Sequence, residues 1–179
     1  SYWHACDLLG HYFDGKAPLI GSTGLITRDG IEKPAFFAFY FLQQLGEYII
    51  EKGENHIITT DGKNNYYILI CNAKKFNHNY YMKREDEITI NELDNIFEDD
   101  NSMNLKIELT GIKSGEYYIK KHRLNEYGGS IIKEWNNLGY IYNLKKEEIQ
   151  YMKSMCNPRM EISKRITNQN ILEFNTKLL

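Results

Sequence analysis

Residues 1–46 constrain the fold of this chain more than any other stretch. A short, mainly apolar and aromatic run ends in an acid at Asp7, as expected of a buried parallel strand that delivers one polar group. A long loop with an Asp29–Gly30 turn follows, and Pro34 suits the first turn of an aromatic-rich helix. Gly46 can end that helix in the left-handed conformation. We interpret this pattern as the last strand and last helix of a (β/α)₈ barrel.

After Gly46 the pattern changes to short strands with turn residues between them. Strands are predicted at 56–60, 66–72, 105–110, 116–124, 160–166 and 171–178. The first two predict a β-hairpin, and the turn between 105–110 and 116–124 is also of hairpin type. The polar region 73–101 predicts one short strand and a mobile excursion. About seven short strands favour a β-sandwich.

Two short helices are predicted within the strand-rich part. Ser130 is a suitable N-cap for a helix over 131–138, and Gly139 can stop it. A second helix over 145–156 places Ile149, Met152 and Cys156 along one stripe.

The fold class is therefore mainly β. A C-terminal β/α remnant of a TIM-type barrel is expected over residues 1–50, and a β-sandwich accessory domain with a short helical insert over residues 51–179. A start without Met, signal peptide or tag indicates a piece of a larger protein.

Composition excludes several classes of function for this segment. The formal charge is −2 and the basic residues are dispersed, so direct binding of duplex DNA by phosphate neutralisation is not expected. Cys6, Cys71 and Cys156 are too scattered for a disulfide framework, and reduced thiols favour a cytoplasmic protein. The five histidines show no ligand spacing, so no metal is expected, and no cofactor motif such as G-x-G-x-x-G occurs. No apolar run is long enough to span a membrane.

Several short motifs, in their order and spacing, resemble the C-terminal part of glycoside hydrolase family 39. Members of this family are β-xylosidase-type barrels with an appended β-sandwich, and similar modules are fused to AraC-type helix-turn-helix regulators. The motifs are Tyr2-Trp3 with Asp7, Gly24-Leu25-Ile26-x-Arg28-x-Gly30-Ile31-x-Lys33-Pro34, Leu42-x-x-Leu45-Gly46, Leu109-x-Gly111, Gly115-Glu116-Tyr117, Arg123-x-Asn125, Gly129-Ser130, Trp135 and Leu138-Gly139.

The resemblance implies that both catalytic carboxyl groups lie on barrel strands upstream, so no catalytic residue is assigned here. It also implies that Trp3 stacks under a sugar ring in the intact parent, because the broad indole matches the apolar face of the ring. A strained non-proline cis bond between Trp3 and His4 is a further implication. Asp7 is expected to be a structural acceptor that holds the end of its strand.

One departure from the family pattern bears on activity. After Leu8–Leu9 the family commonly has acidic residues that can bind sugar hydroxyls, whereas this chain has Gly10 and His11. Glycine offers no side chain, and imidazole offers different donors and acceptors. The departure favours a parent that binds or senses a sugar.

Three functions stay open at this point. The first is a non-catalytic C-terminal segment of a sugar-binding module, the effector-sensing region of an AraC-type regulator. Its partners would be a xyloside-like saccharide and, through a separate upstream domain, DNA. The second is the same segment of an active β-xylosidase. The third is a free-standing carbohydrate-binding β-sandwich. Self-association is expected if the aromatic helix exposes its rings.

Overall fold

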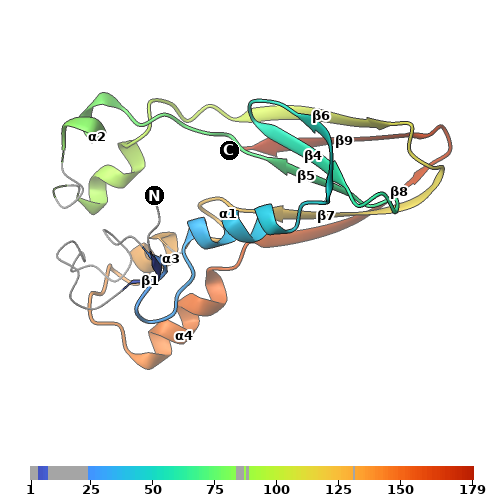
Figure 1. The fold of residues 1–179 in the computed structure, drawn as a ribbon. Helices are drawn as coiled ribbons and strands as arrows, with labels where there is room; N and C mark the ends of the chain where they lie inside the picture. Colours follow the sequence, from blue (N-terminus) through green and yellow to red (C-terminus); the bar gives the residue numbers. More distant parts are fainter. Residues whose placement is uncertain (1–3, 8–23, 84–86, 88, 131) are drawn as a thin grey trace. The chain divides into compact units, whose positions relative to one another are not determined.

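The computed structural model describes residues 4–7, 24–83, 87, 89–130 and 132–179. The chain forms two compact units that are interleaved along the sequence (Figure 1). The first unit contains the described residues up to Tyr40 together with Lys121–Glu161, and the second contains Phe41–Lys120 together with Ile162–Leu179. The sequence instead suggests a division at residue 50, and that division stays a prediction.

The first unit begins with the predicted strand and helix. Strand β1 (His4–Cys6) pairs in parallel with β2 (Gly24–Ile26), and helix α1 (Pro34–Gln43) begins at Pro34 as expected. Strand β2 lies where the sequence indicated only loop. Its three residues are too few for a recognisable period.

The predicted role of Gly46 is wrong. Helix α1 ends at Gln43, and Gly46 does not adopt the left-handed conformation. Its amide donates to Thr59 Oγ1 at 2.8 Å, and an added Cβ would lie 2.5 Å from the carbonyl carbon and oxygen of Thr60. Glycine is therefore required here for close approach of two backbone segments.

The first unit also contains two helices. Helices α3 (Ile132–Asn137) and α4 (Lys146–Met155) confirm the predicted pair. Gly139 and Tyr140 end α3 with φ angles of +71° and +56°. The most deeply buried side chains of this unit are Thr27, Ile31, Trp135, Met152 and Cys156.

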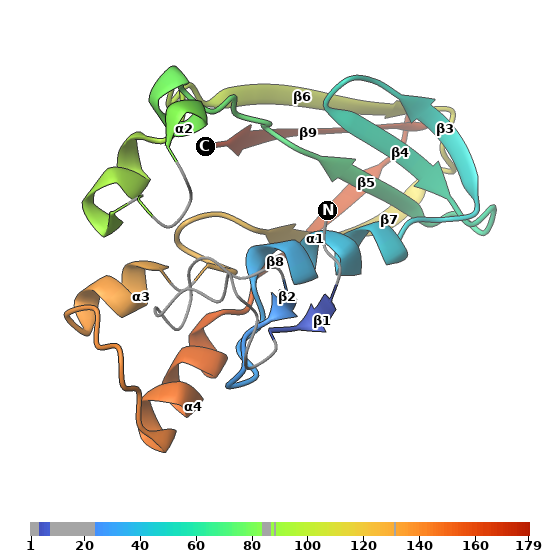
Figure 2. The ribbon, with the colours of Figure 1, turned by 60° about the vertical axis from the view of Figure 1, so that its left-hand side comes forward.

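The second unit is built from strands. Strands β3 (Tyr48–Lys52), β4 (His56–Thr60) and β5 (Tyr66–Ile70) form one antiparallel sheet in that order (Figure 2). The pairing of β4 with β5 confirms the predicted hairpin. Strand β3 was not predicted, and all five of its residues are exposed.

Four longer strands complete the β structure. They are β6 (Met103–Thr110), β7 (Gly115–Arg123), β8 (Arg159–Thr167) and β9 (Ile171–Leu178). Strand β6 pairs antiparallel with β9, and β7 pairs with β8. The hairpin predicted between β6 and β7 is therefore wrong, because the turn passes the chain from one sheet to another.

The buried cluster of the second unit explains this pairing. Its four buried side chains bring together β4, β6, β9 and the turn after β6; they are Ile58, Leu109, Ile112 and Leu172. Tyr117 and Ile119 of β7 pack against this cluster. The two turns that change sheet are also joined, since Ser114 Oγ donates to Asn170 Oδ1 at 2.6 Å. The arrangement is that of a β-sandwich, which confirms the predicted mainly β fold class.

Residues 73–101 differ from the prediction. Their described part contains helix α2 (His78–Met82) and the 3₁₀ helix η2 (Ile90–Asn95), with a single bridge between Phe76 and Phe97 in place of a strand. Side chains stabilise the helix starts: Asn77 Oδ1 accepts from the Tyr80 amide at 2.9 Å. None of the helices in the described residues has the length and apolar content needed to cross a membrane.

Candidate functional site

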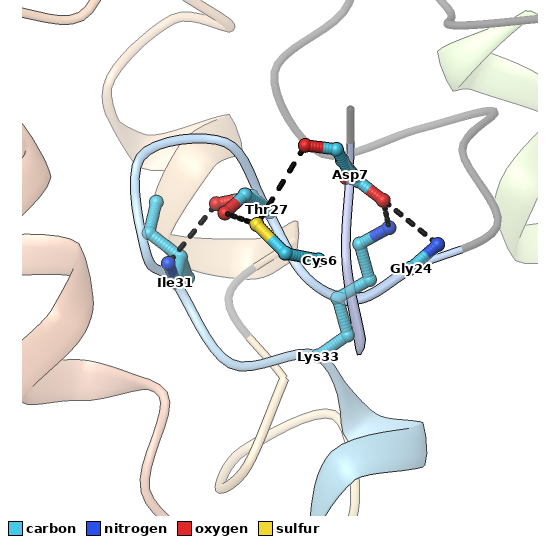
Figure 3. Close-up of polar contacts among 6 residues, drawn as sticks. All are labelled: Cys6, Asp7, Gly24, Thr27, Ile31 and Lys33. Carbon is cyan, nitrogen blue, oxygen red and sulfur yellow. Dashed lines mark hydrogen bonds and ion pairs between the residues drawn. The ribbon is translucent and has the colours of Figure 1, made fainter. Parts of the chain in front are cut away.

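The polar centre of the first unit is Asp7, at the end of β1. One carboxylate oxygen, Oδ1, accepts a hydrogen bond from the Gly24 amide at 2.8 Å and lies 2.8 Å from Lys33 Nζ (Figure 3). The side chains of Lys33 and Asp7 are only 15% and 6% exposed. Because both partners of this oxygen are donors, the carboxylate is neutralised and held in place.

Gly24 is the residue that allows this arrangement. The Asp7 amide donates to the Ile26 carbonyl at 2.8 Å, which draws the two strand segments together. A Cβ on Gly24 would lie 2.5 Å from the Asp7 amide nitrogen and 2.5 Å from Oδ1. Any larger residue at position 24 would therefore push the carboxylate away from Lys33.

The site loop (residues 27–33) returns Lys33 to Asp7. Thr27 and Ile31 close the loop, since the Ile31 amide donates to Thr27 Oγ1 at 3.0 Å and the Thr27 amide donates to the Ile31 carbonyl at 2.8 Å. Gly30 turns the chain with a φ of +79°. The Lys33 amide then donates to the Leu25 carbonyl at 2.9 Å, which fixes the starting point of its side chain.

The predicted site residues have different outcomes. Asp7 is a structural acceptor, as the sequence indicated. Trp3, the predicted sugar platform, and the predicted cis bond between Trp3 and His4 lie outside the described residues. Gly10 and His11, the departure from the family pattern, also lie outside them. Lys33 and Gly24 appeared in the sequence only as parts of a motif, although a buried acid at a strand end requires a donor.

The other described parts of the chain are weaker candidates than this polar centre for a metal or ligand site. Within residues 4–7, 24–83, 87, 89–130 and 132–179, no group of three or more His, Cys, Asp or Glu side chains could hold a metal ion. Two surface depressions, of about 570 and 220 Å³, lie over β6 and β9 and between α2 and η2. Neither is lined by Asp7 or Lys33.

Comparison with known proteins identifies the family. The family model described as "Glycosyl hydrolases family 39" matches residues 1–172. The chain belongs to glycosyl hydrolase family 39. A similar fold is found in the solved structure of a monomeric beta-xylosidase from Caulobacter crescentus CB15, which is 18% identical, with a TM-score of 0.73 over 99% of this chain and 35% of that one. A family 39 enzyme from Xanthomonas axonopodis pv. citri is 16% identical, with a TM-score of 0.66 over 91% of this chain and 31% of that one.

Curated relatives of this family 39 chain include regulators and a xylosidase. An "uncharacterized HTH-type transcriptional regulator" of Staphylococcus aureus (strain COL) is 23% identical over 163 residues, which are 90% of this chain and 20% of the regulator. A "Beta-xylosidase" of Caldicellulosiruptor saccharolyticus is 26% identical over 187 residues, which span 100% of this chain and 34% of that protein. The chain thus corresponds to a fifth to a third of the length of these relatives.

Proposed function

We propose that this chain is the non-catalytic C-terminal segment of a family 39 sugar-binding module that senses an effector in an AraC-type transcription regulator of the cytoplasm. The observation that carries the proposal is the match of helix-turn-helix regulators over nine tenths of the chain. Gly10 and His11, in place of the acidic residues common in the family, add support. The proposal extends to a division of the chain at residue 50 into barrel remnant and accessory sandwich.

In this proposal the chain supplies one wall of the sugar site and no reacting group. Asp7 is occupied by Lys33 and the Gly24 amide, so its carboxylate serves to fix the end of β1. Trp3, four residues earlier on the same segment, would stack under a xyloside-like saccharide. DNA would be bound by a separate upstream domain, because this segment carries a formal charge of −2.

The test uses the full-length product of the gene that encodes this chain. Calorimetric titration with xylose and xylo-oligosaccharides should show saturable binding, and Trp3→Ala should weaken it at least tenfold through loss of the ring contact. Trp135→Phe, far along the sequence, is the matched control. Operator DNA affinity should change when the sugar is added, and an aryl β-xyloside should not be hydrolysed.

An active β-xylosidase is the second candidate, and the 26% identity to a protein of that name favours it. Hydrolysis of the aryl xyloside by the full-length protein, abolished when upstream strand-end glutamates are changed to glutamine, would decide for the enzyme. For a free-standing carbohydrate-binding sandwich, the test is titration of xylose into the 179-residue chain. We expect no saturable binding in that experiment.

A further inference from the structure

The helical insert (residues 124–158) joins β7 to β8, yet it belongs to the same compact unit as the site loop. Two contacts connect the insert with the loop. Lys153 of α4 lies so close to Gly30 that a Cβ there would be 2.9 Å from Lys153 Nζ. Cys156, just after α4, lies beside the backbone amide of Glu32.

These two contacts flank a fully buried residue of the loop. Ile31 stands between Gly30 and Glu32 in the chain and is 1% exposed. On the insert, Met152 of α4 is 0% exposed, and Cys156, four residues further along the chain, is also buried. Burial raises the pKa of the Cys156 thiol, as expected where water is excluded between insert and loop.

Hydrogen bonds give the site loop its shape. Thr27 bonds with Ile31, the Gly30 amide donates to the Thr27 carbonyl at 2.9 Å, and the Lys33 amide donates to the Leu25 carbonyl. An apolar side chain packed at the back of such a loop restricts the openings that would break these bonds. Lys33 is the last residue of the loop, so the restriction reaches the partner of Asp7 directly.

We propose that Met152 is a positioning residue: through the site loop, it keeps Lys33 within reach of Asp7. The helical insert then supports the end of β1, in addition to connecting β7 with β8. The inference goes beyond the proposed function and does not depend on it, because it concerns only contacts within this chain.

Amide hydrogen exchange on the 179-residue chain tests the proposal. In Met152→Ala, the amides of Ile31 and Lys33 should exchange at least tenfold faster than in the wild type. The Ile112 amide, which donates to the Asn170 carbonyl in the second unit, should keep its rate. The conservative variant Met152→Leu should restore slow exchange at Ile31 and Lys33.

A matched control lies on the same helix. Met155 is 41% exposed, so Met155→Ala should leave all these amides unchanged. Cys156→Ala is a milder second variant that removes the thiol beside the Glu32 amide, and it should accelerate exchange at Lys33 severalfold. The Lys33 ammonium signal in a ¹H–¹⁵N spectrum should broaden in both insert variants. Unchanged exchange at Lys33 in both variants, or equal acceleration at Ile112, would overturn the proposal.

Discussion

Asp7 and Lys33 form a buried ion pair, and the loss of one partner should be costly. Among the residues that the structure describes, Lys33→Met leaves the Asp7 carboxylate with the Gly24 amide as its donor, in a place that is 6% exposed. An uncompensated buried charge destabilises a protein by about 3–5 kcal/mol. We expect a decrease of that size in the free energy of unfolding of the first unit, measured by urea denaturation followed by tryptophan fluorescence.

Two further variants separate charge from packing. Asp7→Asn combined with Lys33→Met should recover most of the loss, because the amide oxygen still accepts from Gly24 and no charge remains unpaired. Arg123→Met breaks an exposed pair with Glu161 in the same unit, whose side chains are 42% and 52% exposed. That change should cost less than about 1 kcal/mol. A double variant as unstable as Lys33→Met would contradict this account.

Glu92 is the residue whose ionisation depends most clearly on its neighbours. Hydrogen bonding to Lys83 and to the Thr89 amide and hydroxyl lowers the pKa of Glu92 from 4.5 to about 2. Because the pKa is lowered in the folded chain, the Glu92 contribution to stability is present above pH 4.5 and is lost as the pH falls toward 2. A carboxyl ¹³C NMR titration should find its midpoint near pH 2.

Lys83→Met tests how much the hydrogen bond to Lys83 lowers the pKa of Glu92. It should raise the pKa of Glu92 while leaving it below 4.5, because the Thr89 amide and hydroxyl still donate. Glu116, whose pKa is lowered by Lys164, serves as the control and should titrate unchanged. If Glu92 reached its ordinary pKa in this variant, the hydrogen bonds from Thr89 would contribute nothing to its ionisation.

At the scale of single residues, the sequence predicts the local role of a side chain but not its partners far along the chain. The acid at the end of an apolar strand predicts a held acceptor, and Asp7 is one. Its cation, Lys33, is 26 positions away, and periodicity carries no information on such a contact. Gly46 shows a related limit: glycine indicates either a left-handed residue or close approach, and only the Thr60 backbone decides between them.

At the scale of elements, periodicity predicts strands but not their partners. Alternation along β6 assigns Leu105, Ile107 and Leu109 to one face, and the structure agrees that these residues are the less exposed ones. It does not reveal whether β6 pairs with β7 or with β9, since either choice buries the same face. Strand β3 was missed because its consecutive apolar residues do not alternate and all are exposed.

Helix α1 should make the chain associate with itself. Its large apolar side chains cover more of the helix than one buried face requires: Phe37 is buried, whereas Phe39, Tyr40 and Leu42 are 53%, 46% and 49% exposed. Exposed apolar side chains gathered on one helix favour contact with a second copy or another apolar surface. Sedimentation velocity of the chain should therefore show a weight-average mass that rises with concentration.

Phe39→Lys combined with Leu42→Lys should reduce this association. Tyr81→Lys, which changes a side chain that is 68% exposed on α2, is the matched control and should leave it unchanged. A chain that stays monomeric at millimolar concentration would show that the α1 rings are not an association surface.

At the scale of the whole molecule, the two units depend on distant parts of the chain. A fragment of residues 51–179 lacks Ile31 and Thr27, which are buried in the same unit as Trp135 and Met152. We expect Trp135, which is 0% exposed in the full chain, to become hydrated in the fragment. Its fluorescence emission should shift to longer wavelength.

The comparison needs a full chain with one tryptophan. Trp3→Phe leaves Trp135 as the sole tryptophan, so its emission can be compared with that of the fragment. The Ile112 amide should stay protected in both, because its bond to Asn170 lies within the second unit. Identical emission in the two proteins would support residue 50 as a true domain boundary.

The chain passes between its two units inside regular elements and not in linkers. The passages fall after Tyr40 in α1, after Lys120 in β7 and after Glu161 in β8. A recombination point placed at any of them would cut a hydrogen-bonded helix or a paired strand. Gene recombination that moved such a module between a regulator and a hydrolase should therefore have transferred these residues as one piece, with the recombination points outside them.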